Sequence, residues 1–255
     1  RKKAKLYNFP LKNKDKTFQQ TLLLETDIVS ADLTHAKLRK VLLVDLDFSD
    51  KDLSGADLSG ATLIRIDLSQ SDLSHAKLKQ TNLQGVNLTK AKLQDADLSG
   101  AKFSKAILTK ADLQGVKLQG ACLKNAELDG ANLQGADLSG ADLNRTNLTG
   151  SDLTGANLTG ADCRSACLNR TIISKTTFQK TNLRKVDFSG KDLKSLNFCE
   201  ADLRRTDFRN SNLEAAQFFK ADLRNTLFTE ANLKQAYLAC ALFQGTDFDY
   251  ANLSE

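Results

Sequence analysis

The sequence predicts an all-β solenoid, a chain wound into one long coil with flat sides, on the strength of three observations. First, an apolar residue recurs every five positions from Phe18 to Leu253; these 48 positions hold only Leu, Phe or Ile, apart from Cys163. Second, Ala, Thr, Ser or Val lies two positions earlier in 42 of the 48 units. Third, the 255 residues include one Pro and no Trp or Met, which favours one regular element over a mixed core.

A period of five excludes both a plain helix and a flat strand, because their side chains repeat every 3.6 and 2.0 residues. A turn in every unit solves the problem. We call each five-residue unit a pentad, its large apolar residue the centre, and the residue two earlier the small position. Both point inward, and the other three residues point outward.

All 14 glycines lie two residues after a centre, which we call the turn position. A phosphate-binding loop would instead gather its glycines in front of one helix. The shared phase indicates corners of the coil, where glycine relieves the cost of a positive φ. The Asp or Asn that precedes most centres is expected to cap these corners.

The motif A-(D/N)-L-x-x, as in ANLQGADLSGADLNRTNLTG, resembles the pentapeptide-repeat family over residues 16–255. The resemblance implies a right-handed quadrilateral β-helix with four pentads per coil. It would have about 12 coils and, at a strand spacing of about 4.8 Å, a length of about 58 Å. We expect residues 16–255 to form this single domain and residues 1–15, which are rich in Lys, to form a basic N-terminal arm or cap.

The residues that catalysis usually requires are scarce. The only histidines, His35 and His75, fall at outward turn positions, and no CxxC occurs among the five cysteines. We expect a non-enzymatic rod without a pocket, with no cofactor and no metal site, and reduced thiols in a cytoplasmic compartment. No apolar run reaches the length of a membrane span.

Sorting the outward residues by a 20-residue coil divides the charges between two pairs of sides. The two sides centred on the series Phe18 and Leu23 carry a net charge of +9, and the two centred on Ile28 and Leu33 carry −12. The rod is therefore expected to be electrically split along its length.

Four arginines repeat every 20 residues and should stack one per coil. We call Arg164, Arg184, Arg204 and Arg224 the arginine ladder; Arg145, Lys185 and Arg205 lie beside it. One interpretation is a surface that binds anions or an acidic partner. The other is a solvated face with local ion pairs to Asp162, Asp202 and Asp222.

Apolar residues at outward phases form a second set of candidates. On one side of the first coils we expect a cover, either the N-terminal arm or a partner, over Leu22, Leu24, Leu42, Val44 and Ile64. Near the other end we expect contacts at Phe219, Tyr237 and Leu242. An open solenoid end exposes its core, so a second copy, a partner or further chain should cover it.

The leading hypothesis is a non-catalytic interaction or scaffold protein that presents its charged faces to a protein partner. A nucleic-acid-related role is the first alternative. The quinolone-resistance members of the family imply an acidic DNA mimic that binds topoisomerase and dimerises through a C-terminal helix, whereas this sequence shows a basic half and no such helix. Direct nucleic-acid binding through the ladder is the other form of this alternative. The third hypothesis is a module of a secreted effector or of a larger protein.

Overall fold

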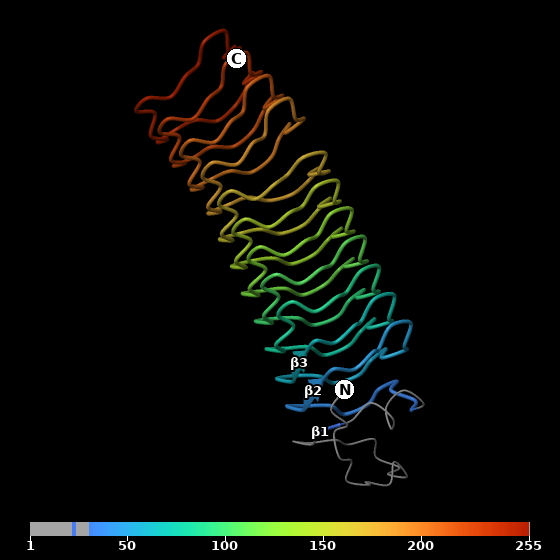
Figure 1. The fold of residues 1–255 in the computed structure, drawn as a ribbon. Coiled ribbons are helices and arrows are strands. Elements are labelled where there is room, and N and C mark those ends of the chain that lie inside the picture. The colour runs from blue at the N-terminus through green and yellow to red at the C-terminus, as the bar shows by residue number, and fades with distance from the viewer. Residues whose placement is uncertain (1–21, 24–30, 255) are drawn as a thin grey trace.

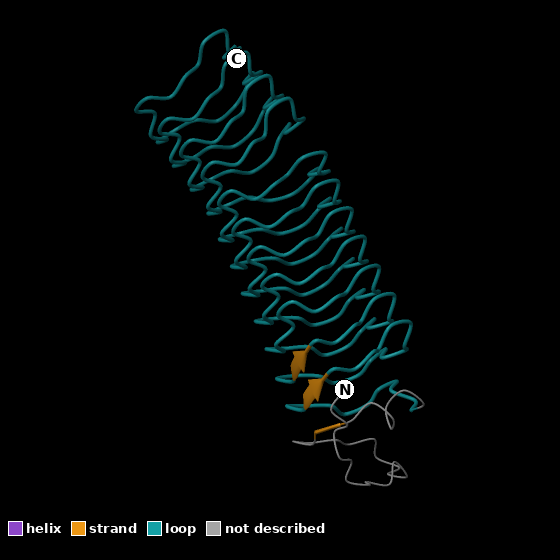
Figure 2. Cartoon of the chain, in the orientation of Figure 1, coloured by secondary structure: helices purple, strands orange, loops and turns teal. Residues whose placement is uncertain are grey.

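The computed structural model describes residues 22–23 and 31–254. In this range the chain winds into coils that stack along one axis and build a rod (Figure 1). Three short strands lie on one side of its first coils: β1 (Leu22–Leu23), β2 (Leu42–Val44) and β3 (Thr62–Ile64). They form a parallel sheet in the order β1-β2-β3 (Figure 2). Single parallel bridges join the later coils.

These bridges fix the period of the coil at 20 residues. They pair Lys37 with Asp57, then Asp57 with Lys77, and continue in the same register to Asn232 with Asn252. Four pentads therefore make one turn of the solenoid, as the resemblance implies. The right-handedness and the total of twelve coils stay predictions.

Backbone hydrogen bonds join each coil to the next. The N–H of a centre donates to the carbonyl 19 residues later, as from Leu38 to Asp57 at 2.7 Å, and the N–H of Asp57 donates back to Ala36 at 2.9 Å. Within a pentad the small position closes a turn by donating to the preceding centre, as from Ala36 to Leu33 at 3.1 Å.

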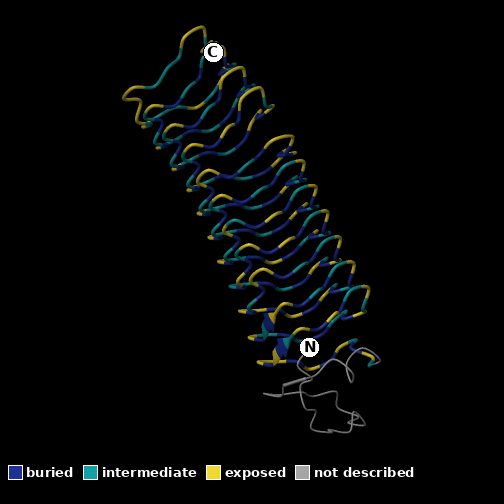
Figure 3. Ribbon diagram, in the orientation of Figure 1, coloured by how far each residue is buried: buried dark blue, intermediate teal, exposed yellow. Residues whose placement is uncertain are grey.

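The core is filled by the two inward phases (Figure 3). The small position accepts Thr or Ser because the hydroxyl finds a carbonyl inside: Thr206 donates to Leu183 of the preceding coil at 2.9 Å, and Ser71 donates to Leu68 at 2.7 Å. Within the described range, no buried side-chain nitrogen or oxygen lacks a hydrogen bond. Polar residues therefore enter this core without the penalty of an unsatisfied buried group.

The turn position has a left-handed backbone in every pentad from residue 35 to residue 250. Its φ lies between 52° at Arg65 and 71° at Gly245, and 30 of these positions carry a residue other than glycine. The left-handed backbone that was inferred from the glycines is thus a property of the position.

From Phe178 to Phe228 the centres alternate between phenylalanine and leucine, whereas the centres before them are mainly leucine. Phe178, Phe198 and Phe218 stack on one wall, with ring centroids 5.3 Å and 5.2 Å apart. Phe188 and Phe208 stack at 5.2 Å on the opposite wall and meet the first series edge to face. The alternation that the sequence shows therefore produces two interleaved aromatic columns.

A seam interrupts the inter-coil hydrogen bonds where this aromatic core begins. Between residues 168 and 197 the regular bonds are missing at the N–H groups of residues 168, 170, 173, 175, 187, 192 and 197. Lys191 occupies a small position here, and its Nζ donates at 3.2 Å to the carbonyl of Thr171, which the N–H of Asp192 would otherwise reach. The step between neighbouring coils is visibly wider at this seam (Figure 1).

Candidate functional site

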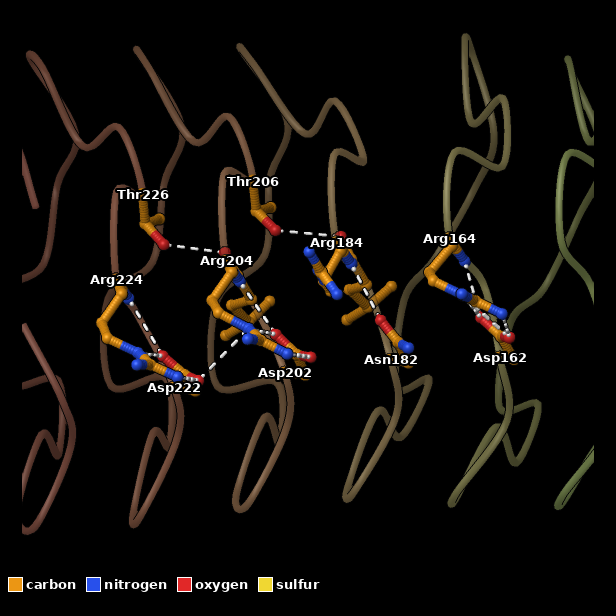
Figure 4. A network of polar contacts seen from close by, with 12 residues as sticks. Asp162, Arg164, Asn182, Arg184, Asp202, Arg204, Thr206, Asp222, Arg224 and Thr226 are labelled. Atoms are coloured by element: carbon orange, nitrogen blue, oxygen red, sulfur yellow. Dashed lines mark hydrogen bonds and ion pairs between the residues drawn. The ribbon is translucent and has the colours of Figure 1, made fainter.

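The arginine ladder forms as expected from the period of 20. Parallel bridges align Asp162, Asn182, Asp202 and Asp222, so that the arginines two residues further on also follow one another along the rod. Figure 4 shows the four arginines on successive coils.

Three of the four guanidinium groups are held by an aspartate of their own pentad. Arg224 donates from Nε to Oδ1 of Asp222 at 2.8 Å and from Nη2 to Oδ2 at 2.6 Å. Arg204 makes the same pair of bonds to Asp202, and its Nε also lies 3.3 Å from Oδ2 of Asp222. Arg164 repeats the arrangement on its own coil. Local ion pairing, the second interpretation of the ladder, therefore applies to three of its members.

The ion pairs shift the pKa values of both partners in the direction of the charged forms. The hydrogen bond from Arg224 is the main cause that lowers the pKa of Asp222, and the same bond raises the pKa of Arg224. Both groups are therefore charged over the whole physiological range of pH.

Arg184 is the exception, because Asn182 stands where the other pentads have aspartate. Asn182 accepts only the backbone N–H of Arg184, at 3.3 Å. Among the described residues no carboxylate forms an ion pair with the Arg184 guanidinium, which turns toward the coil of Arg204 (Figure 4). The N-L-R triplet, as opposed to D-x-R, is visible in the sequence and could have identified this residue.

A recess of about 420 Å³ opens beside Arg184. Its lining consists of Arg184, Arg204, Arg205, Arg224, Asn225, Gln244 and Gly245. The expectation that a packed rod has no pocket was therefore wrong: long side chains on successive coils enclose space above the backbone, although the core itself is full.

The sequence interpretation missed three of these lining residues. Gln244 lies one coil after Arg224, and Asn225 and Gly245 lie one and two coils after Arg205. Their phase identifies them as neighbours of the ladder. A Cβ atom at position 245 would lie 2.8 Å from Oδ1 of Asn225, so glycine keeps this end of the recess open.

The basic residues beside the ladder all occupy exposed turn positions. Arg145, Lys185 and Arg205 have φ values of 57°, 62° and 61°. In the described part of the chain, none of the three forms an ion pair. Arg205 contributes to the recess, whereas Arg145 and Lys185 lie outside its lining.

The apolar candidates are partly confirmed as surface residues. Leu42 of β2 is 41% exposed and Ile64 of β3 is 38% exposed, while Val44 is half-buried. Leu22 lies in β1, in register with Leu42. Leu24 and the arm of residues 1–15 lie outside the described residues, so the cover that was expected from the arm stays a prediction.

The C-terminal candidates include two exposed apolar side chains and one partly buried ring. The rings of Phe219 and Tyr237 stack at 6.0 Å, and the Nζ of Lys220 lies 5.0 Å from the centre of the Phe219 ring. Tyr237 and Leu242 are 49% and 53% exposed. In the last coil a centre is uncovered as well, since Phe243 is 41% exposed. Nothing in the structure shows what covers these residues.

The described residues hold no other cluster with the features of a chemical site. No group of three metal-ligating side chains occurs in residues 22–23 and 31–254. Burial raises the pKa of the Cys163 thiol far above its usual range, which favours an unreactive thiol. A helix that is long and apolar enough to cross a bilayer is not found in this range.

Solved structures with similarity to this chain include two repeat proteins. HetL, a pentapeptide repeat protein involved in heterocyst differentiation regulation from the cyanobacterium Nostoc sp. Strain PCC 7120, is 29% identical, with 85% of this chain and 89% of that chain covered and a TM-score of 0.47. QnrB1, a plasmid-mediated fluoroquinolone resistance protein, is 23% identical, with 69% and 88% covered and a TM-score of 0.40. A search of the curated proteins gives no match.

The profile of the pentapeptide repeats matches most of the chain, in overlapping segments over residues 52–190 and in two more over 192–225 and 226–255. The matched repeat is the unit that the structure shows, with two inward residues, a left-handed turn position and four units per coil. The chain belongs to the pentapeptide-repeat family.

Proposed function

We propose that the chain is a non-catalytic interaction protein whose rod presents the arginine ladder to an acidic protein partner. The observation that supports this most strongly is the contrast along the ladder. Arg164, Arg204 and Arg224 are each held by an aspartate, whereas Arg184 has no carboxylate partner among the described residues and faces a recess.

The paired arginines contribute to such a surface by their rigidity. A guanidinium group that is fixed by two hydrogen bonds loses little side-chain entropy when a partner binds. The stack therefore offers donors at regular intervals along the rod, and Arg184 adds the uncompensated charge. Charge complementarity of this kind raises the association rate and selects the partner.

The experiment is a capture from a nuclease-treated extract of the organism that encodes the chain. The intact protein is compared with a variant in which the four ladder arginines are replaced by glutamine. A matched variant replaces by glutamine four exposed lysines without ion pairs in the described chain, on the acidic sides: Lys90, Lys110, Lys175 and Lys234.

We expect a partner to be captured by the intact protein and by the lysine variant and to be lost with the ladder variant. Both variants change the net charge equally, so a general charge effect would weaken them equally. Capture that survives the ladder variant would instead assign binding to the apolar surfaces around Leu42 and Tyr237.

Direct binding of nucleic acid is the second candidate, favoured by the excess of basic residues on the ladder side. It requires a continuous cationic track, or aromatic side chains on which bases stack. Asp162, Asp202 and Asp222 interrupt the positive charge on this side, and no aromatic residue lines the recess. Titration with a labelled DNA duplex at two salt concentrations tests this candidate, because a phosphate-tracking surface gives a steep salt dependence.

Three further parts of the hypothesis stay proposals. One is a reducing, cytoplasmic location, in line with five cysteines that are all free thiols. Another is a second copy or other cover over the exposed last coil. The third, a role as a module of a larger protein, concerns chain outside residues 1–255.

A further inference from the structure

The recess beside Arg184 has an excess of positive charge that its own residues do not neutralise. Four arginines line it, and no carboxylate does. Asp202 and Asp222 compensate Arg204 and Arg224 through short bidentate pairs. Arg184 and Arg205 have no ion pair within the described chain. Two arginines without an ion pair in the described chain therefore line the same recess.

The donors around this space outnumber what a carboxylate can accept. Each free guanidinium offers five N–H groups in a planar fork. The amides of Asn225 and Gln244 add N–H₂ groups from the next coils. A carboxylate has only two oxygens, whereas a phosphate monoester has three terminal oxygens and a charge of about −1.5 to −2 at neutral pH. The charge and the number of donors both fit the phosphate better.

The surrounding pairs also preorganise the recess. Asp202 and Asp222 bind Nε and Nη2 of their arginines, and so fix the two guanidinium planes along one edge. At the other edge Gly245 leaves open the space in which a Cβ would contact Asn225. The volume of about 420 Å³ is in the range of ligand clefts, about 300–1,000 Å³, and has room for a phosphate together with the side chain that bears it.

We propose that the recess formed by Arg184, Arg204, Arg205 and Arg224 binds a phosphate group carried on a phosphorylated side chain of the partner protein. This inference rests on the proposed function, since it specifies what the ladder recognises. Phosphate from a small molecule would offer the same chemistry, and the experiment separates the two sources. A nucleic-acid backbone offers singly charged diesters, which match this doubly charged recess less well.

The test uses Asn182→Asp, which supplies the carboxylate that the other ladder pentads possess. We expect the new carboxylate to hold Arg184 as Asp202 holds Arg204, so that the recess loses its main free guanidinium while every arginine stays in place. Arg184→Gln removes the group directly. The control, Asn197→Asp, makes the same change of charge at the same phase on another side, where Asn197 accepts the N–H of Cys199 at 2.9 Å.

Binding is measured by fluorescence anisotropy at low ionic strength with three labelled Gly/Ser-rich peptides that differ at one position, which is phosphoserine, glutamate or serine. We expect the intact protein and Asn197→Asp to bind the phosphoserine peptide best. Asn182→Asp and Arg184→Gln should bind it about 10- to 100-fold more weakly, as expected for loss of charge-assisted hydrogen bonds. Binding should also weaken as the pH falls below about 6, where the phosphate loses its second charge.

Two kinds of result would overturn the proposal. Equal affinity for the three peptides, or equal binding by Asn182→Asp and Asn197→Asp, would show that the recess does not recognise phosphate. Binding of inorganic phosphate without binding of the phosphopeptide would exclude a partner-borne source. If the phosphate inference alone is wrong, the peptide test fails but the ladder variant still loses the partner that the intact protein captures. If the proposed function is wrong, the ladder variant captures the same proteins as the intact protein.

Discussion

The left-handed turn position leads to a prediction with opposite signs at two sites. Ala215 has φ 56° and Gly85 has φ 67°, and a Cβ added at Gly85 would meet no atom within 4 Å. An L-residue in this conformation costs about 1–2 kcal/mol. A glycine avoids this cost, but it stabilises the unfolded chain by about 0.4–1 kcal/mol because the unfolded backbone gains conformational entropy. Ala215→Gly should therefore raise the free energy of unfolding, and Gly85→Ala should lower it, each by about 0.5–1 kcal/mol.

The assay is urea unfolding followed by far-UV circular dichroism, with the midpoints compared at a fixed protein concentration. The control is Ala136→Gly at a buried small position, which lies outside the left-handed set and is fully buried. This control should lower the free energy of unfolding, because it removes a packed methyl group and raises the conformational entropy of the unfolded chain. If Ala215→Gly destabilises the protein as Ala136→Gly does, backbone strain at the turn position is not the controlling term.

Three further predictions concern the seam, the core and the ion pairs. Native-state hydrogen exchange should be faster at the amides of Leu168 and Ile173 than at those of Leu148 and Leu153, the centres one coil earlier, because only the latter pair donates to the next coil; equal protection would contradict the seam. Phe198→Ala should lower the free energy of unfolding by about 3–5 kcal/mol in urea titrations, because Phe198 stacks on rings of both neighbouring coils, and a loss below about 1 kcal/mol would contradict this packing. The pKa of Asp222 is lowered in the folded protein, so its contribution to stability is present above the unfolded pKa of about 3.9 and is lost as the pH falls through the folded value. In an acid titration, Asp222→Asn should therefore lose less stability below about pH 4 than the intact protein does. An acid transition that is unchanged in the variant would exclude this contribution.

Much of the fold follows from the sequence because each pentad repeats one local arrangement. The inward phases are readable since a large and a small apolar residue recur without a slip, and the turn positions are readable from the glycines. The 20-residue register came from the family resemblance; it depends on how wide the core is, which no single pentad determines.

The sequence predicted the position of the candidate site but not its ion pairs. The stack of the arginine ladder follows from the period, but whether a guanidinium folds onto its own aspartate or faces outward depends on side-chain geometry. The aspartates of the D-x-R pentads accept both backbone and guanidinium N–H groups, and Asn182 accepts only a backbone N–H. One amide in place of a carboxylate thus leaves Arg184 turned to the recess.

The sequence by itself determined the repeat and the inward residues, because these depend only on the position within the pentad. Only the tertiary structure decided which charges are neutralised, where a recess opens and where the coils separate. The recess and the separated coils arise from contacts between coils, such as that of Lys191 with Thr171, and depend on the sizes of stacked side chains, which a repeat pattern does not specify. The neutralised charges depend on side-chain conformation within a pentad, as in the pair of Arg204 with Asp202.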